Sequence, residues 1–259
     1  MPASAPEPRP GPRVLAIARA ETATVARSPL YWVTTALVVA SAATVVLWQL
    51  ETYEALQARL RATPGSRSFH DVVIGSSLSI LLWVIVIVQP LVAARAIVEE
   101  RARGTLMLMF VSPASALDIV AGKFLAQCAA ALLWVILVGA FLFALSLFFP
   151  LDRGQIAAAS LGLALATTAI AAVALLCSCA FAQVTSAVLA ALALLAILAL
   201  GGTMFAGDNP DAARLSLFGQ IAPMFLGILP VSALVSAGLV IGGALAAATL
   251  TLASERYLG

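Results

Sequence analysis

Five stretches of this chain carry no charged residue and are long enough to cross a lipid bilayer. They comprise residues 28–50, 72–94, 124–151, 154–207 and 215–254. A membrane-spanning helix needs about 20 apolar residues, because each residue advances about 1.5 Å across a hydrocarbon core of about 30 Å. The fourth stretch is long enough for two such helices joined by a tight turn. The chain is therefore expected to cross a membrane several times.

The composition supports the same fold class. Only 10% of the residues are charged and 63% are hydrophobic, whereas an average soluble domain is about 25% charged. Such a chain is not disordered, collagen-like, coiled-coil or an ordinary cytosolic enzyme, and its net charge of +2 is too small to indicate nucleic-acid binding. We predict an all-α integral membrane protein whose six-helix transmembrane domain covers residues 29–259. The spans are expected near 30–50, 72–94, 120–149, 156–180, 184–206 and 231–253.

The last charge-free stretch is longer than one helix requires. Its first part, residues 215–229, contains Gly219, Pro223 and Gly227, and Pro230 follows directly. These helix-breaking residues fit a re-entrant or interfacial pair of short helices, since non-helical backbone at membrane depth must be buried in protein or hydrated. A loop followed by one slightly long helix is the alternative, and the sequence leaves both interpretations open.

The distribution of positive charge predicts the orientation. If the N-terminus is cytoplasmic, nine of the Lys and Arg residues fall in cytoplasmic segments and five on the other side. The nine are Arg9, Arg13, Arg19, Arg27, Arg95, Arg101, Arg103, Lys123 and Arg256, and the five are Arg59, Arg61, Arg67, Arg153 and Arg214. Because cytoplasmic loops are enriched in Lys and Arg, we expect both termini to lie in the cytoplasm and the chain to sit in the cytoplasmic (inner) membrane.

The N-terminal region is expected to comprise a tail and an amphipathic helix. Residues 1–12 contain five prolines and no apolar core, so they read as a flexible tail rather than a signal peptide. Residues 13–28 form an interfacial helix with Val14, Ala18 and Val25 on one face and Arg13, Arg19 and Arg27 on the other. Glu21 falls on the apolar side, where it either contacts protein or is solvated at the edge of the helix.

The loop after the second span, residues 95–119, combines charges with a short apolar segment. Glu99, Glu100, Arg101 and Arg103 leave the membrane, Gly104 breaks the helix, Thr105 can cap a short helix 106–111, and Ser112-Pro113 breaks it again. A capping box, Ser115 to Asp118, opens the third span, and Lys123 follows one turn later, where it can snorkel to the interface. A short apolar helix framed by charges suits docking into another protein's groove, whereas a plain polar loop would not need its apolar residues.

These motifs resemble those of the ABC type-2 exporter permeases. The matching residues are Glu100-Arg101-x-x-Gly104-Thr105-Leu106, Ser112-Pro113, Gly122-Lys123, Glu21, Arg27-Ser28-Pro29-Leu30-Tyr31 and Pro90. In detail the chain looks most like the permeases linked to gliding motility and to nitrous-oxide-reductase maturation. One departure is Met107, where many members carry an acidic or polar residue.

The resemblance implies a dimer of permeases, formed with itself or with a paired permease in the lipid bilayer. Two ATP-binding subunits would dock beneath it and carry ATP and Mg, so this chain would hold no cofactor. The loop 95–119 would supply the coupling helix, and the ATPase interface would comprise Glu21, Glu99, Glu100, Arg101, Arg103, Gly104, Thr105, Leu106, Leu108, Ser112 and Pro113. The turn at residues 180–186 would make a second, smaller contact.

The chain itself is not expected to be an enzyme. It has no G-x-x-x-x-G-K-[ST] phosphate loop, because Gly122-Lys123 lacks the first glycine and is followed by Phe124. No catalytic, cofactor-binding or metal-binding residue is predicted; His70 is read as an interface residue, and Cys177 and Cys179 face opposite sides of a helix. The alternatives are a secondary transporter or channel that works without ATP, and a membrane assembly factor of the same fold.

Two further sets of residues concern packing and cargo. Gly238, Gly242 and Ala246 form a row of small residues on the last span, which permits close helix contact within the monomer or across a dimer. Ser77, Thr167 and Gln89, among other polar residues of the spans, either line a substrate path or bond between helices. A mostly apolar path suits lipid-like, peptide-like or drug-like cargo, and polysaccharide or small inorganic cargo also fits the family.

Overall fold

The computed structural model describes residues 10–62, 69–104, 115–149, 151–204 and 216–258, and every regular element in these ranges is a helix. In chain order they are α1 (Pro10–Arg27), α2 (Pro29–Ala62), the π-helix η1 (His70–Gly75), α3 (Ser76–Ala93), α4 (Arg95–Ala102), α6 (Ala116–Leu145), α7 (Arg153–Ala180), α8 (Val184–Met204), α9 (Leu217–Phe225) and α10 (Val231–Leu258). Within the described ranges, six helices are long and apolar enough to cross a membrane, and one of them runs from η1 through α3 into α4. The prediction of an all-α membrane protein with six spans is confirmed.

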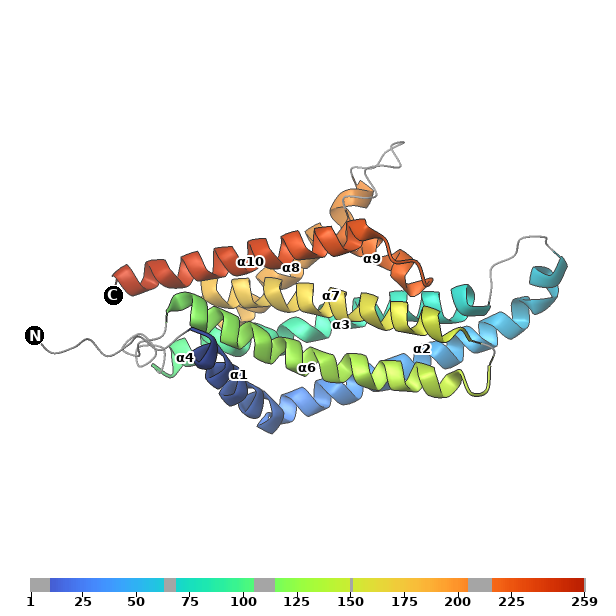
Figure 1. Cartoon of the computed structure of the whole chain (residues 1–259), viewed down its shortest axis with the longest axis horizontal. Helices are drawn as coiled ribbons and strands as arrows, with labels where there is room; N and C mark the ends of the chain where they lie inside the picture. The colour runs from blue at the N-terminus through green and yellow to red at the C-terminus, as the bar shows by residue number, and fades with distance from the viewer. Residues whose placement is uncertain (1–9, 63–68, 105–114, 150, 205–215, 259) are drawn as a thin grey trace, which may run out of the picture.

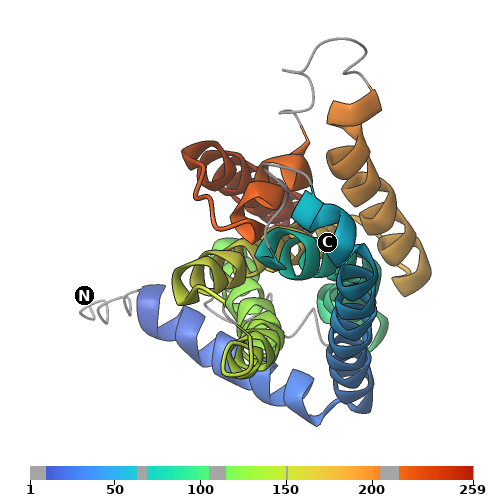
Figure 2. The same ribbon diagram turned by 90° about the vertical axis from the view of Figure 1, so that its right-hand side faces the viewer.

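The spans run side by side along the long axis of the molecule (Figure 1). Helices α1 and α4, the start of α6 and the end of α10 lie at one end, which we call the terminal end because the first described helix begins there and the last one ends there. The turn between α6 and α7 lies at the opposite end. Figure 2 looks along the bundle and shows α1 lengthwise, whereas α2 and α6 are seen nearly end-on. Helix α1 therefore lies across the terminal end instead of along the bundle, as an interfacial helix does.

Local sequence signals set several helix boundaries as expected. Helix α1 ends at Arg27 and α2 begins at Pro29, so the break falls on the residue before the proline. Gly104 follows α4 with φ of +72°, a conformation that favours glycine. The capping box is present: the Asp118 amide donates to Ser115 Oγ at 3.1 Å, and the Ser115 amide donates to Asp118 Oδ2 at 3.0 Å.

One other expected boundary differs from the structure, and a second lies outside the described residues. Helix α1 begins at Pro10, inside the stretch 1–12 that was expected to be a tail, and residues 1–9 lie outside the described part. Proline is tolerated in a first helical turn because its missing amide hydrogen would have no partner there. The short helix expected at 106–111 lies outside the described residues, so it stays a prediction.

Helix α7 occupies the centre of the bundle, and its small side chains explain why. Ala166, Ala169 and Ala172 are fully buried, and neighbouring helices approach closely along this row. Gly162 allows the closest approach: a Cβ atom there would lie 2.8 Å from Met224 Cβ on α9. Helix α7 thus serves as the surface against which α3, α6, α8, α9 and α10 pack.

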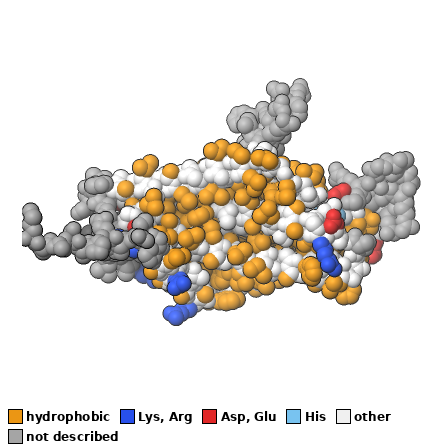
Figure 3. Space-filling view, viewed as in Figure 1, with side chains coloured by type: hydrophobic (Ala, Val, Ile, Leu, Met, Phe, Trp, Pro, Cys, Tyr) orange, Lys and Arg blue, Asp and Glu red, His pale blue; other side chains and the backbone are white. Residues whose placement is uncertain are grey.

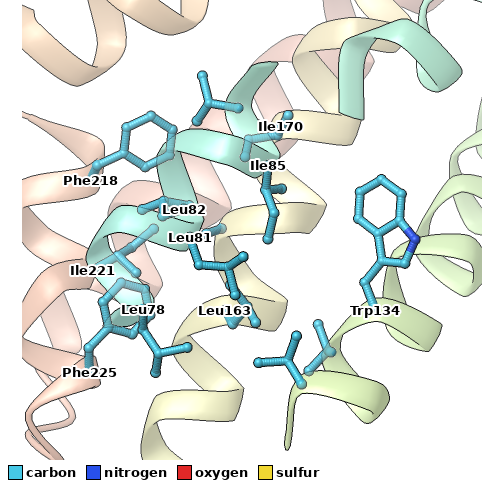
Figure 4. Packing of buried hydrophobic residues seen from close by; sticks show 14 of the residues in the cluster. Leu78, Leu81, Leu82, Ile85, Trp134, Leu163, Ile170, Phe218, Ile221 and Phe225 are labelled. Atoms are coloured by element: carbon cyan, nitrogen blue, oxygen red, sulfur yellow. The ribbon is translucent and has the colours of Figure 1, made fainter. Parts of the chain in front are cut away.

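The segment before the last span is a short buried helix followed by a turn. Helix α9 begins after Ser216, whose Oγ accepts from the Gly219 amide at 3.1 Å, and the turn to α10 contains Gly227 with φ of +86°. Figure 4 shows Phe218, Ile221 and Phe225 of α9 pointing toward the side chains of α3 and α7. The structure thus has one short helix where a pair of short helices or a plain loop was expected, and burial of its apolar face holds it between neighbouring helices.

The outer surface of the bundle is apolar. On the face shown in Figure 3, hydrophobic side chains cover the middle of the molecule and the charged side chains lie toward its two ends. Large exposed side chains such as Trp48, Ile87 and Leu239 belong to different spans. Such a surface would be unfavourable in water and is typical of helices that face lipid.

Candidate functional site

Three charged side chains from three helices meet inside the terminal end. Lys123 of α6 is completely buried, and its Nζ lies 2.8 Å from Glu100 Oε1 of α4 and also contacts Glu21 Oε1 of α1. Lys123 Nζ donates a further hydrogen bond to the Ala96 carbonyl at 2.8 Å. We call Glu21, Glu100 and Lys123 the charge triad. A buried ammonium group is tolerated because these oxygen atoms replace its water.

The crossing of α1 over α6 brings the charge triad together. A Cβ atom on Gly122 would lie 2.7 Å from Ile17 Cγ2 and 3.2 Å from the Val14 carbonyl oxygen. Only glycine therefore permits α1 to approach α6 this closely at that point. Because Lys123 follows Gly122 directly and Glu21 follows Ile17 by one helical turn, the close crossing also brings the lysine and the carboxylate together.

The charge triad contradicts the expected position of the Lys123 side chain and decides between the two interpretations of Glu21. Lys123 does not snorkel to the interface as expected, because its side chain turns inward to two carboxylates and a backbone carbonyl. Of the two interpretations of Glu21, the contact with protein is the one found. The sequence indicated that Glu21 was on the apolar side of its helix but did not identify the lysine as its partner.

Helix α4 begins with a cap that comes from another helix. Helix α3 ends at Ala93 and α4 begins at Arg95, so the helical bonding pattern is interrupted between them and amide groups in the first turn of α4 can bond elsewhere. Ser178 of α7 is fully buried, and its Oγ accepts hydrogen bonds from the amides of Ile97 at 2.9 Å and Val98 at 3.3 Å. This hydroxyl joins the start of α4 to the end of α7.

Arg101 of α4 joins three further parts of the terminal end. Its guanidinium donates to the carbonyls of Cys179 at 3.0 Å and Phe181 at 2.6 Å, where α7 ends. The same guanidinium forms an ion pair with Glu255 of α10, at 2.6 and 2.8 Å to the two carboxylate oxygens. A cation at a helix C-terminus satisfies free carbonyls and interacts favourably with the helix dipole. Arg101 therefore connects α4 with the turn before α8 and with α10.

The remaining charges of α4 face outward. Glu99 lies between two arginines on the helix surface, 3.4 Å from Arg95 and 3.0 Å from Arg103. The side chains of Arg95 and Arg103 are 46% and 70% exposed. We call Arg95, Glu99 and Arg103 the outer α4 face. Exposed pairs of this kind contribute little to stability, so they remain available to contact another molecule.

A polar pocket of about 280 Å³ opens between α1 and α4. Its lining includes side chains from the charge triad and from the outer α4 face, together with Ser28 and Gln127. We call it the terminal-end pocket. Four of the expected interface residues, Glu21, Glu99, Glu100 and Arg103, thus lie around a single opening.

The expected ATPase-interface residues thus fall into three groups. Arg103 and Gly104 are exposed and Glu99 is partly exposed, whereas Glu21, Glu100 and Arg101 are bound within the bundle. The residues Thr105, Leu106, Leu108, Ser112 and Pro113 lie outside the described part. The turn 180–186, expected as a second contact, connects to α4 through the bond from Arg101 to the Phe181 carbonyl.

The row of small residues on α10 does not pack within the described monomer. Gly238, Gly242 and Ala246 are exposed, and a Cβ atom on either glycine would meet nothing within 4 Å among the described residues. The buried face of α10 instead carries Ala237, Ala244 and other residues. Within the described residues α10 turns a different face to α7, and contact of this row across a dimer stays a prediction.

Ser178 and Glu255 are the residues that sequence reasoning missed. Ser178 stands between two cysteines in an apolar span, and nothing in its neighbourhood indicates a capping role. Glu255 ends the last charge-free stretch, and a charge at the end of a span is ordinarily read as solvated. Their roles depend on helices that are distant in sequence, so no local signal could have identified them.

The family model for ABC-2 family transporter protein matches residues 49–253, which is more than half of the chain. The matched range includes Glu100 and Lys123 of the charge triad, whereas α1 with Glu21 precedes it. No curated protein matches the chain.

Proposed function

The chain belongs to the ABC-2 transporter family and is a membrane permease subunit, and we propose that it exports its substrate as a dimer driven by two separate ATPase subunits. In this proposal it lies in the cytoplasmic membrane with both termini in the cytoplasm. ATP hydrolysis takes place on the partner chains, and this chain converts their movement into transport. The observation that carries the proposal is the terminal end, where exposed and buried charges of one short helix are combined.

The outer α4 face is the part of the proposed ATPase interface that lies in described residues. Arg95 and Glu99 lie on α4 and Arg103 directly follows it, just before residues 105–114 in the sequence. Exposed charged side chains give orientation and specificity to a protein contact, and apolar residues in its centre give affinity. The apolar residues Leu106 and Leu108 follow in the sequence and would supply that centre.

The buried charges of the same helix support a mechanical role. Glu100 ties α4 to α1 and α6 through Lys123, and Arg101 ties it to α7 and α10. A displacement of α4 by a partner would therefore act on four other helices at once. ATP binding can shift the permease between two states only if the partner binds these states differently. A firmly connected α4 would move together with the helices it contacts, so in this proposal the partner would meet a differently placed α4 in each state.

Copurification tests the proposal. The tagged chain, solubilised in mild detergent, should bring with it an ATP-binding subunit that hydrolyses ATP. The charge reversals Glu99→Lys and Arg103→Glu should lower the amount of that subunit recovered per permease. Arg153→Glu, at the opposite end of the bundle, is the matched control and should not change it.

The outcomes separate the proposal from its rivals. If no ATP-binding subunit accompanies the unaltered chain, the chain works without such a partner and the proposal fails. If the subunit is recovered equally with all variants, the ATPase contact lies away from the outer α4 face. Membrane insertion of each variant is checked in the same preparation.

A further inference from the structure

Helices α2, α3 and α6 enclose a small polar cavity next to the terminal-end pocket. The cavity has a volume of about 10 Å³ and is lined by Tyr31, Gln89, Val92, Gln127 and Trp134, with two alanines of α6. We call it the glutamine cavity. All four of its polar or aromatic lining side chains are buried. Two buried amides beside one cavity are unusual inside a membrane helix bundle, where each polar group needs a partner.

Gln89 leaves one polar atom facing no protein partner. Its Nε2 donates to the Thr167 carbonyl on α7 at 2.8 Å. Its Oε1 has no hydrogen-bond partner within the part of the chain that the structure describes, although the side chain is only 3% exposed. A buried acceptor without a partner costs about 1–3 kcal/mol. A cavity of about 10–15 Å³ with polar walls is large enough to hold one water molecule.

The glutamine cavity lies next to the terminal-end pocket. Val92 and Gln127 belong to the walls of both. The larger pocket is lined by charged residues of α1 and α4 and opens at the end of the bundle. Water in this pocket would therefore be separated from the glutamine cavity by shared side chains such as Gln127 and Val92.

The other side of the glutamine cavity is closed by aromatic side chains. The rings of Tyr31 and Trp134 stack with their centroids 6.3 Å apart. The Tyr31 hydroxyl donates to the Ala130 carbonyl at 2.9 Å, and Trp134 Nε1 donates to Thr35 Oγ1 at 2.8 Å. Their polar atoms are satisfied within the protein, so neither side chain needs a hydrogen bond from the cavity.

We propose that Gln89 and Gln127 form a water-binding site inside the single subunit, supplied from the terminal-end pocket and closed by Tyr31 and Trp134. The bound water donates a hydrogen bond to Gln89 Oε1 and so satisfies the acceptor that the protein leaves open. Its surroundings are amide and hydroxyl groups without charge. The site is independent of the ATPase partner. It places water between α2, α3 and α6 inside the membrane domain.

Radiolytic labelling in water enriched in oxygen-18 tests this site with the full chain in lipid nanodiscs. Hydroxyl radicals formed from bound water oxidise aromatic side chains next to it, so Tyr31 and Trp134 report on the cavity despite their burial. We expect both to gain oxygen-18 in the unaltered chain. Gln89→Leu and Gln127→Leu should each cause loss of the label, because they remove the groups that hold the water.

Gln49→Leu is the matched control, since Gln49 is also buried but lies about five helical turns from Tyr31 along α2. It should leave the label on Tyr31 and Trp134 unchanged. The proposal is overturned if these residues are not labelled in the unaltered chain. It is also overturned if the label persists in either leucine variant, because water would then be held beside the aromatic pair without that glutamine. Thermal unfolding of each variant shows that the label is compared between folded proteins.

Discussion

Replacing Lys123 by methionine is the sharpest test of how the terminal end is held together. The substitution keeps the length and most of the volume of the side chain but removes its charge. Glu21 and Glu100, which both contact the lysine, would then face each other without a neutralising cation. We expect the chain to lose stability and α1 to leave its place across α6.

The size of the effect follows from the geometry. At the 2.8 Å that separates Lys123 Nζ from Glu100 Oε1, the gross attraction is about 6 kcal/mol at an effective dielectric constant of about 20. Desolvation of the ions offsets part of this, and removing one partner of a buried ion pair typically costs about 3–5 kcal/mol. For chains near this size each kcal/mol lowers Tm by about 2–4 °C, so we expect a decrease of about 6–20 °C.

Two measurements on the purified chain check the prediction. Thermal unfolding followed by tryptophan fluorescence gives the change in Tm. Limited digestion with trypsin at Arg19 and Arg27, which are exposed on α1, reports on that helix alone and should become faster. Arg95→Met is the matched control, because it removes an exposed cation of a surface ion pair and should lower stability by no more than about 0.5 kcal/mol.

A compensated variant separates charge from packing. Combining Lys123→Met with Glu21→Gln and Glu100→Gln leaves three neutral side chains, and it should recover much of the lost stability. If Lys123→Met lowers Tm no more than Arg95→Met does, the charge triad does not hold α1 and the reasoning is refuted. If the compensated variant is as unstable as the single one, the loss comes from packing instead of charge.

Three further substitutions test the other contacts of the terminal end. Gly122→Ala should cost about 1–3 kcal/mol and speed trypsin digestion of α1, because its Cβ would lie 2.7 Å from Ile17 Cγ2. Ser178→Ala should cost about 1–2 kcal/mol in thermal unfolding, since two buried amides of α4 lose their acceptor. Arg101→Met should lower Tm more than Glu255→Gln, because it removes the bonds to the end of α7 as well as the ion pair.

Each of these substitutions has a control on the same chain. Gly242→Ala on α10 adds a Cβ atom where the described residues leave open space, so it should not destabilise the monomer. Ser186→Ala removes an exposed hydroxyl and should have little effect. Equal losses in a variant and its control would contradict the specific contact. For Arg101, a loss equal to that of Glu255→Gln would show that the bonds to α7 contribute nothing.

The sequence by itself determined the membrane architecture. Charge-free stretches gave the number of spans, because the bilayer admits few uncompensated charges and requires a minimum helix length. Proline and glycine placed the breaks at Pro29 and Gly104, and the pair Ser115 and Asp118 placed the start of α6. These features depend on residues that are close together in the chain, and their physical causes are local.

Tertiary structure alone decided which charges are internal and which are available to a partner. Glu99, Glu100, Arg101 and Arg103 look alike in sequence, yet the helix turns the middle two toward other helices and leaves the outer two exposed. The partner of Glu100 is Lys123, brought within reach only because α1, α4 and α6 converge there. Burial and ion pairing depend on side chains far apart in the chain, so the packing of the helices, and not their order, separates the structural charges from the exposed ones.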